Sequence, residues 1–182
     1  MSSESVPLNQ DQLLYGCVFC MTGKEIEIAQ RIEEDWPGVS ARAVRVLKRR
    51  TKKGVKTTGF EVAIPGYVFF RAEEGFVPYG YPMRGWHLLR ENDGGWRLYD
   101  RDEQFARWLF VHDGDIGMSK AYQVGDRVQI QQGPLKELEG FIRKIDKRNQ
   151  SGKVEITVNG NTFQVWLGYE LLESELSFPM KL

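Results

Sequence analysis

The stretch from Phe60 to Phe70 restricts the possible folds of this chain more than any other part of the sequence. It reads Phe-Glu-Val-Ala-Ile-Pro-Gly-Tyr-Val-Phe-Phe, an apolar strand pattern interrupted by Pro65-Gly66. Proline cannot donate a hydrogen bond to a sheet ladder, so Pro65 marks a strand start or a sheet edge. After it, side chains alternate between the two faces of a strand. The stretch therefore requires a sheet in which it can be buried.

A basic run comes immediately before this stretch. Its eight cations occur with no acidic residue until Glu61, and they are Arg42, Arg45, Lys48, Arg49, Arg50, Lys52, Lys53 and Lys56. The alternation at residues 44–47 predicts a strand, and Lys53-Gly54 predicts the tip of a hairpin that returns through residues 55–64. Such a hairpin can present cations to phosphates. The alternative is a solvated hairpin whose lysines protect a sheet edge, but the lack of compensating acids favours nucleic acid.

The residues before the basic run predict a strand followed by a helix. Leu13 to Cys20 is an apolar run of strand length, and Thr22-Gly23-Lys24-Glu25 fits a capping box in which Thr22 and Glu25 cover each other's amides. Pro37-Gly38 ends the helix. The apolar face at helical spacing consists of Ile26, Ala29, Ile32 and Trp36.

The residues after Phe70 complete the first predicted domain. Trp86 to Leu89 is a short strand candidate, and residues 92–95 read Asn-Asp-Gly-Gly, a strong turn signal. A second helix is predicted from Asp100. Its apolar face contains Phe105, Trp108 and Leu109. We expect a disordered tail at 1–12 and a mixed α/β domain at 13–112.

The sequence pattern changes after His112, from long apolar segments to a polar stretch followed by short alternating segments. Residues 113–121 are polar and contain glycine, which predicts a linker. Asn159-Gly160 is a strong tight-hairpin signal. Short alternating segments follow the linker at 127–130, 140–145, 154–158 and 163–167. This spacing predicts a small β-barrel as a second domain at 122–175.

Composition and missing motifs exclude several classes of protein. The net charge is zero, so nucleic-acid binding must come from local clustering of cations. No apolar run approaches the roughly 18 residues that span a membrane, and the polar N-terminus lacks a signal-peptide pattern, so we expect a cytoplasmic protein. There is no phosphate-cradling glycine loop, GxSxG or HExxH. His87 and His112 are isolated, and we predict no enzyme activity, cofactor or metal.

Cys17-Val18-Phe19-Cys20 is the one motif that favours an enzyme. A CxxC before a helix is typical of thioredoxin-like redox sites. However, Cys17 lies inside the predicted strand, and residues three apart on a strand point to opposite faces. We therefore interpret both residues as ordinary strand cysteines, with an oxidoreductase as the alternative.

Two sequence motifs resemble the NusG family of transcription elongation factors. Gly66-Tyr67-Val68-Phe69 after Pro65 resembles its PGYV signature, and residues 124–145 resemble its KOW module. The KOW-like positions include Gly125, Asp126, Gly133, Pro134 and Gly140. The resemblance covers roughly Leu13 to Glu173. It implies an α+β fold with a ferredoxin-like N-terminal (NGN) domain and an SH3-like β-barrel KOW domain.

The resemblance also implies a partner for the first domain. Members of the family dock this domain on the clamp helices of RNA polymerase and suppress pausing. Carried over to this chain, the polymerase-binding residues are Ile64, Pro65, Gly66, Tyr67, Phe69 and Trp86. His87 borders the same surface. This raises the expectation that aromatic side chains, including that of Phe60, form an exposed patch.

Residues 113–119 and 133–135 resemble the specialised LoaP-type antiterminators more than the housekeeping factor. Those paralogues recognise an RNA hairpin in the nascent leader, which gives the basic run a partner, with upstream or non-template DNA as alternatives. The implied nucleic-acid-binding residues are Arg45, Lys48, Arg49, Arg50, Lys52, Lys53 and Lys56.

The predicted barrel departs from the housekeeping pattern at one turn. Residues 158–161 form a polar turn where the housekeeping factor carries an aromatic and a basic residue for ribosome or Rho coupling. We therefore expect a monomeric antitermination factor, and the alternative is a general elongation and pausing factor.

Overall fold

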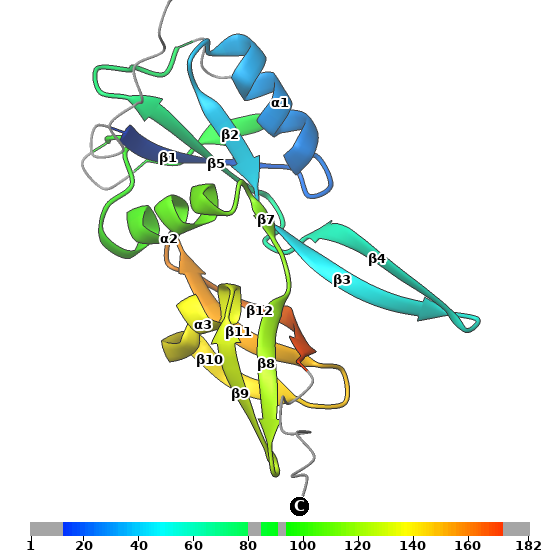
Figure 1. Cartoon of the computed structure of the whole chain (residues 1–182). Helices are drawn as coiled ribbons and strands as arrows, with labels where there is room; N and C mark the ends of the chain where they lie inside the picture. Colours follow the sequence, from blue (N-terminus) through cyan, green and yellow to red (C-terminus); the bar gives the residue numbers. More distant parts are fainter. Residues whose placement is uncertain (1–12, 80–84, 91–93, 173–182) are drawn as a thin grey trace, which may run out of the picture. The chain divides into compact units, whose positions relative to one another are not determined.

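A computed structural model describes residues 13–79, 85–90 and 94–172 of the chain (Figure 1). The described residues combine helices and sheets, so the predicted α+β fold class is confirmed. They divide into two compact units. The first contains the chain up to Val44 together with Pro65–Val111, and the second contains Arg45–Ile64 together with the chain from His112 onward.

The first unit is built on a four-stranded sheet. Its elements in chain order are β1 (Leu13–Cys20), α1 (Glu25–Asp35), β2 (Ser40–Ala43), β5 (Tyr67–Glu73), β6 (Trp86–Leu88) and α2 (Asp100–Val111). The strand order is β2-β5-β1-β6, and all neighbours are antiparallel. This is the ferredoxin-like order, but the fourth strand here precedes the second helix.

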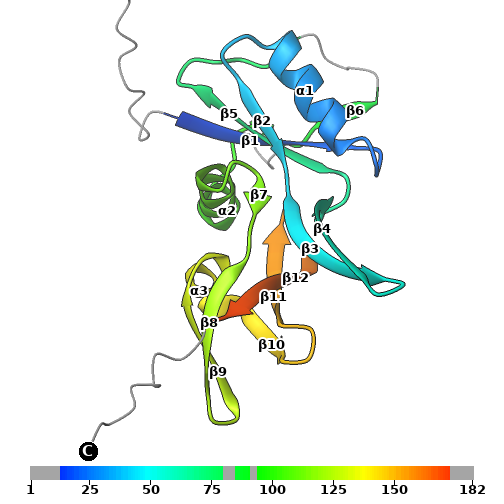
Figure 2. The ribbon, with the colours of Figure 1, turned by 45° about the vertical axis from the view of Figure 1, so that its right-hand side comes forward.

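Helices cover both faces of this sheet, as Figure 2 shows for α1 and α2. Val18 and Phe70 belong to the core cluster beneath α1, which also contains Ile28 and Ile32. The alternate residues face α2, where the rings of Phe69 and Phe105 lie 5.4 Å apart. Because β5 is central and covered on both faces, its first four side chains are all buried.

The basic run forms a hairpin in the second unit, except for Arg42, which lies in β2 of the first unit and pairs with Glu33. β3 (Arg45–Lys52) and β4 (Val55–Val62) pair antiparallel, and β3 also pairs in parallel with β7 (Asp115–Ile116). Lys53 and Gly54 connect the hairpin with φ angles of 49° and 80°. Two left-handed residues in sequence match the twist of the flanking strands, which confirms the predicted hairpin tip.

The rest of the second unit is a five-stranded SH3-like sheet in the order β10-β11-β12-β8-β9. Its elements are β8 (Ser119–Val124), β9 (Arg127–Gln132), α3 (Pro134–Glu137), the 3₁₀ turn η2 (Glu139–Phe141), β10 (Ile142–Asp146), β11 (Ser151–Val158) and β12 (Asn161–Leu171). The pairs are antiparallel except for β12 with β8. Asn159 and Gly160 have φ angles of 48° and 75°, which confirms the predicted tight turn.

Some local features differ from the sequence-based expectation. The segment 113–121, expected as a linker, contains β7 and the start of β8, and the hairpin at 45–64 groups with the second unit. Lys24, not Thr22, is the N-cap of α1 and makes no side-chain capping bond. Ile26 is exposed and Ile28 is buried in its place. The tail at 1–12, the turn residues 92 and 93, and residues 173–175 lie outside the described residues.

Candidate functional site

The Pro65-Gly66 turn leads into the central strand β5, and a buried carboxylate fixes its backbone. The amide of Gly66 donates a hydrogen bond of 2.7 Å to Oε1 of Glu25. Its carbonyl accepts one of 2.8 Å from the amide of Cys20. Gly66 has a φ of 84°, and a Cβ there would lie 2.8 Å from the ring of Phe19. Both the backbone angle and the space therefore require glycine.

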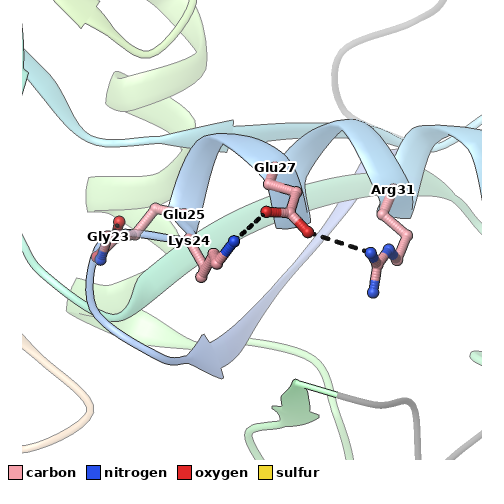
Figure 3. Close-up of polar contacts among 5 residues, drawn as sticks. All are labelled: Gly23, Lys24, Glu25, Glu27 and Arg31. Carbon is pink, nitrogen blue, oxygen red and sulfur yellow. Dashed lines mark hydrogen bonds and ion pairs between the residues drawn. The ribbon is translucent and has the colours of Figure 1, made fainter.

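Glu25 is a buried acid at the start of α1, with a relative exposure of 1%. Its Oε2 accepts a 2.9 Å hydrogen bond from the amide of Gly23, so two backbone amides stabilise the carboxylate. Figure 3 shows the contrasting solvent side of the helix, where Glu27 pairs with Lys24 at 2.7 Å and with Arg31 at 3.2 Å. Glu25 does accept a backbone hydrogen bond from before the helix start, but the donor is the amide of Gly23 and not that of the predicted Thr22.

The prediction of an exposed aromatic patch beside Pro65-Gly66 is wrong for most of its members. Of the aromatic side chains expected in the patch, those of Tyr67, Phe69 and Trp86 are buried, whereas that of Phe60 is exposed. In the rest of the predicted polymerase-binding set, Ile64 and Gly66 are buried and Pro65 is exposed. The prediction assumed a sheet with one free face. Because helices cover both faces, the ring of Trp86 packs against Trp36 at 5.4 Å, and Phe69 packs against α2.

A different set of apolar side chains is exposed near the turn. Phe19 at the end of β1, Met21 after it and Ile26 in the first turn of α1 are 37%, 69% and 46% exposed. The ring of Phe19 lies 5.3 Å from that of Tyr67 and 5.4 Å from that of His87. In the sequence Phe19 belongs to the apolar run at 13–20, and no motif marked it as a site residue. Its position as a strand-end aromatic before a loop was a signal that could have indicated exposure.

Several cations of the hairpin already have partners within the second unit. Arg45 forms a bidentate ion pair with Asp115. Its Nε donates a hydrogen bond of 2.6 Å to Oδ1, and its Nη2 donates one of 2.6 Å to Oδ2. Arg49 donates to Glu170 at 2.5 Å, and Arg50 pairs with Glu61 at 2.6 Å. Charge in the run is thus compensated by acids that come later in the chain, which the local sequence pattern could not indicate.

Lys48 and the tip lysines have no comparable ion pair. Lys48 is half-buried, its Nζ donates to the carbonyl of Trp166 at 2.7 Å, and burial lowers the pKa of its ammonium. Lys52, Lys53 and Lys56 are exposed at the end of the hairpin. Within residues 13–79, 85–90 and 94–172, the structure records no ion pair for these three side chains. They are the members of the predicted nucleic-acid set that remain available.

The KOW-like residues occupy turns that shape the five-stranded sheet. Gly125 has a φ of 57° between β8 and β9, and the carbonyl of Asp126 accepts a hydrogen bond from Lys147. A Cβ on Gly133 would lie 2.9 Å from the Cα of Ser119, which explains the glycine there. Pro134 opens α3, and Gly140 lies in η2. The KOW-like residues therefore have a structural role in the turns of this sheet.

The two cysteines are free and buried in the core. Cys20 lies in the cluster beneath α1, while Cys17 feels the charge of Asp102 on α2, so their side chains are on opposite faces. Burial raises the pKa of Cys20 to about 11 and raises that of Cys17 well above its usual value. Neither thiol is therefore activated as a nucleophile at neutral pH.

The two histidines do not form a catalytic pair. His87 is exposed on β6, and Nε2 of His112 lies 2.6 Å from Oε2 of Glu137. Among the described residues, no group of histidine, cysteine or acidic side chains could hold a metal ion. No helix in this part of the chain is long and apolar enough to cross a membrane.

The fold defines a class of protein with two parts: a helix-covered antiparallel sheet, followed in the chain by a small five-stranded β unit. The chain is similar to a solved structure described as "Domain interaction in Thermotoga maritima NusG". The identity is 22%, the similarity covers 88% of this chain and 96% of that chain, and the TM-score is 0.41. No known family model and no curated protein matches the chain.

Proposed function

We propose that this protein is a non-enzymatic transcription elongation factor of the NusG type, acting as an antiterminator on RNA polymerase. The observation that carries this proposal is the order of its parts. A sheet of ferredoxin-like strand order contains the Pro65-Gly66-Tyr67 turn, and a β unit with the KOW-like glycine turns follows it in the chain. The two motifs that resemble the family thus occupy defined structural positions.

The first unit binds the polymerase through a surface different from the predicted aromatic patch. Phe19, Met21 and Ile26 are exposed, and Pro65 adds an apolar ring beside them in the turn. A helical partner such as the clamp helices presents apolar side chains that such a surface can cover. The Glu25 carboxylate holds the adjoining backbone in place, which lowers the ordering cost of binding.

The second unit contacts RNA through the hairpin tip. Lys52, Lys53 and Lys56 are exposed cations without recorded acidic partners in the described part of the chain, whereas Arg45 and Arg50 are paired. A-form RNA presents phosphates and hydroxyls that cations recognise by shape, without a base-reading code. This fits the LoaP-type mode, in which a leader hairpin selects the transcript.

The polymerase surface is tested by retention of the full chain on reconstituted elongation complexes. Phe19→Ser should reduce retention at least roughly tenfold, because a central apolar anchor contributes much of the energy of an interface. Val111→Ser is the matched control, since Val111 is an exposed apolar residue at the end of α2. Equal retention of both variants and the wild type would refute this docking surface.

Antitermination is tested by run-through transcription in vitro on templates with and without the cognate leader. We expect read-through of a downstream terminator to increase only when the leader is present. An equal effect on both templates would identify a general elongation and pausing factor. No effect on either would contradict the proposed class.

A further inference from the structure

A basic groove lies within the second unit, beside the hairpin tip, with which it shares Lys56. It has a volume of about 660 Å³ and runs between the β3–β4 hairpin, the β10–β11 turn and β12. The side chains and backbone that line it include Lys48, Arg49, Arg50, Lys56, Arg148 and Trp166. The volume falls in the range of pockets that bind small ligands, so the groove can hold a short segment of a larger molecule.

The charge of the groove is unbalanced. Five of its lining residues are cations and none is acidic. The guanidinium of Arg49 contacts Glu170 and that of Arg50 contacts Glu61, but these carboxylates are outside the lining. The side chains of Lys56 and Arg148 have no acidic partner recorded within the described residues. A wall of this kind attracts an anion with several charges.

Lys48 gives a second, independent indication. Its Nζ is half-buried and donates to the carbonyl of Trp166 at 2.7 Å, an uncharged acceptor. Partial burial lowers the pKa of this ammonium because little solvent stabilises its charge. The charge of Glu61 offsets part of this effect, and a phosphate beside the ammonium would add further counter-charge. The groove is therefore more favourable for an anion than an equal number of fully solvated lysines.

The turn that carries Arg148 is fixed by its own hydrogen bonds. The amide of Asn149 donates to Oδ1 of Asp146 at 2.9 Å, and its side-chain nitrogen donates to Oδ2 at 2.8 Å. The carbonyl of Gln150 accepts a hydrogen bond of 2.9 Å from the amide of Tyr169, which connects the turn to β12. Arg148 thus projects from a rigid base, which reduces the entropy lost on binding.

Trp166 is the aromatic residue in the lining of the same groove. Its neighbours Val165 and Leu167 in β12 are buried, so alternation places the half-buried indole on the outer face. Nζ of Lys153 lies 5.4 Å from its ring centroid. Cations that follow a backbone and an aromatic ring on which a base can stack are the two components of single-strand recognition.

We propose that this groove binds a single strand of nucleic acid, with phosphates at Lys48, Lys56 and Arg148 and one base on Trp166. This site extends the nucleic-acid contact of the proposed function from the hairpin tip to a groove that also includes the barrel. The groove has walls on two sides and suits one strand, whereas the exposed tip can follow a duplex. RNA and DNA share the sugar–phosphate chemistry, and the experiment distinguishes them.

The test measures fluorescence anisotropy of labelled octauridylate and octathymidylate with the full chain over a series of salt concentrations. Arg148→Ala should weaken binding and lower the slope of log K against log salt by about 0.7, the value for one lost phosphate contact on a single strand. Trp166→Ala should weaken binding roughly 5- to 150-fold with the slope unchanged, because stacking releases no counterions. Trp166→Phe should restore most of the affinity.

Arg127→Ala is the matched control, because Arg127 is an exposed arginine on β9 outside the groove lining. Thermal melting of each variant verifies that it is folded. Equal binding by wild type, Arg148→Ala and Trp166→Ala, or no binding of either oligonucleotide, overturns the groove. Displacement by polyglutamate at the same charge concentration also overturns it, in favour of an acidic protein segment.

The proposed function is tested separately by a blunt leader hairpin without unpaired ends. If that hairpin binds through Lys52 and Lys53, which lie outside the groove lining, while the single strands do not bind, the groove is refuted and the tip contact stands. If the single strands bind through Arg148 and Trp166 while the hairpin does not, the groove stands and leader recognition at the tip is refuted.

Discussion

The carboxylate of Glu25 accepts a hydrogen bond of 2.7 Å from the amide of Gly66. This bond joins two residues that are far apart in the chain, at the turn that leads into the central strand. The same carboxylate accepts the amide of Gly23 at 2.9 Å. One buried acid thus fixes both the start of α1 and the Pro65-Gly66 turn. The exposed Phe19 lies against this turn, so the stability of the turn and the shape of the proposed docking surface depend on one another.

Removal of this carboxylate should destabilise the first unit. Glu25→Ala leaves the buried amide of Gly66 without an acceptor, and we expect the free energy of unfolding to fall by about 2–3 kcal/mol. Glu25→Gln retains one oxygen and should cost about 1 kcal/mol. Urea denaturation followed by tryptophan fluorescence measures both. Glu27→Ala, on the solvent side of the same helix, should leave stability nearly unchanged, because solvent screens its ion pairs. If Glu25→Ala and Glu27→Ala are equally stable, the buried hydrogen bond makes no net contribution to the free energy of unfolding.

Gly66 and Gly38 form a matched pair for the cost of close packing. Both have a positive φ, 84° and 83°, so alanine is strained at either position. Only at Gly66 would the new Cβ meet other atoms, 2.8 Å from the Phe19 ring and 3.2 Å from the carbonyl of Cys20. Gly38→Ala should cost about 1 kcal/mol and Gly66→Ala at least about 1 kcal/mol more. Denaturation midpoints compare the two, and a smaller loss for Gly66→Ala would contradict the packing argument.

The paired and the available cations of the hairpin should separate in function. Arg45→Gln breaks the two-bond contact with Asp115 and should lower stability by about 1 kcal/mol, with leader affinity unchanged. Lys52→Gln combined with Lys56→Gln should do the reverse, lowering affinity and reducing the salt dependence of binding. Lys53→Asn can be added, because asparagine tolerates the φ of 49° at this position. Gel-shift titrations at several salt concentrations measure the effect. A loss of leader affinity in Arg45→Gln, with the affinity of the lysine variants unchanged, would contradict the proposal.

The cysteines should be unreactive in the folded protein. With a pKa of about 11, only about a thousandth of Cys20 is thiolate at pH 8, and Cys17 is fully buried. Iodoacetamide should label neither residue without denaturant at pH 8, and labelling of Cys20 should accelerate as the pH rises toward 11. Cys17→Ala with Cys20→Ala should retain antitermination. Rapid labelling at neutral pH together with loss of activity would restore the oxidoreductase alternative.

The turn that carries Arg148 should respond to acid. Hydrogen bonds from Asn149 lower the pKa of Asp146 below its usual 3.8. The stabilisation that this pairing provides is therefore present above pH 3.8 and is lost as the pH falls through the lower folded-state pKa. Asn149→Ala removes the side-chain donor and keeps the backbone amide, so the pKa of Asp146 should rise only part of the way toward 3.8. Carboxyl-carbon NMR titration measures this shift, and an unchanged pKa would show that the side-chain hydrogen bond does not stabilise the carboxylate.

Local sequence patterns determined most of the elements of this protein. The apolar run at 13–20, the alternation around Lys53-Gly54 and the Asn159-Gly160 turn each predict structure from neighbouring residues, and the structure has a strand or a hairpin at each. These patterns succeed because side-chain periodicity and left-handed turn residues act over a few positions. The PGYV-like and KOW-like motifs are local in the same sense.

Only the tertiary structure decided which side chains are exposed and which charges are free. Tyr67, Phe69 and Trp86 are buried because α2 and α1 cover opposite faces of the sheet. The uninterrupted apolar run at 67–70 agrees with burial on both faces, whereas the family resemblance placed these side chains on the surface. Arg45 and Arg49 are neutralised by Asp115 and Glu170, which lie far along the chain. Burial and ion pairing depend on residues brought together by folding. For that reason the strand patterns on either side of Pro65-Gly66 could be recognised in the sequence. Their division between β4 of the second unit and β5 of the first unit, and the burial of each side chain, could not.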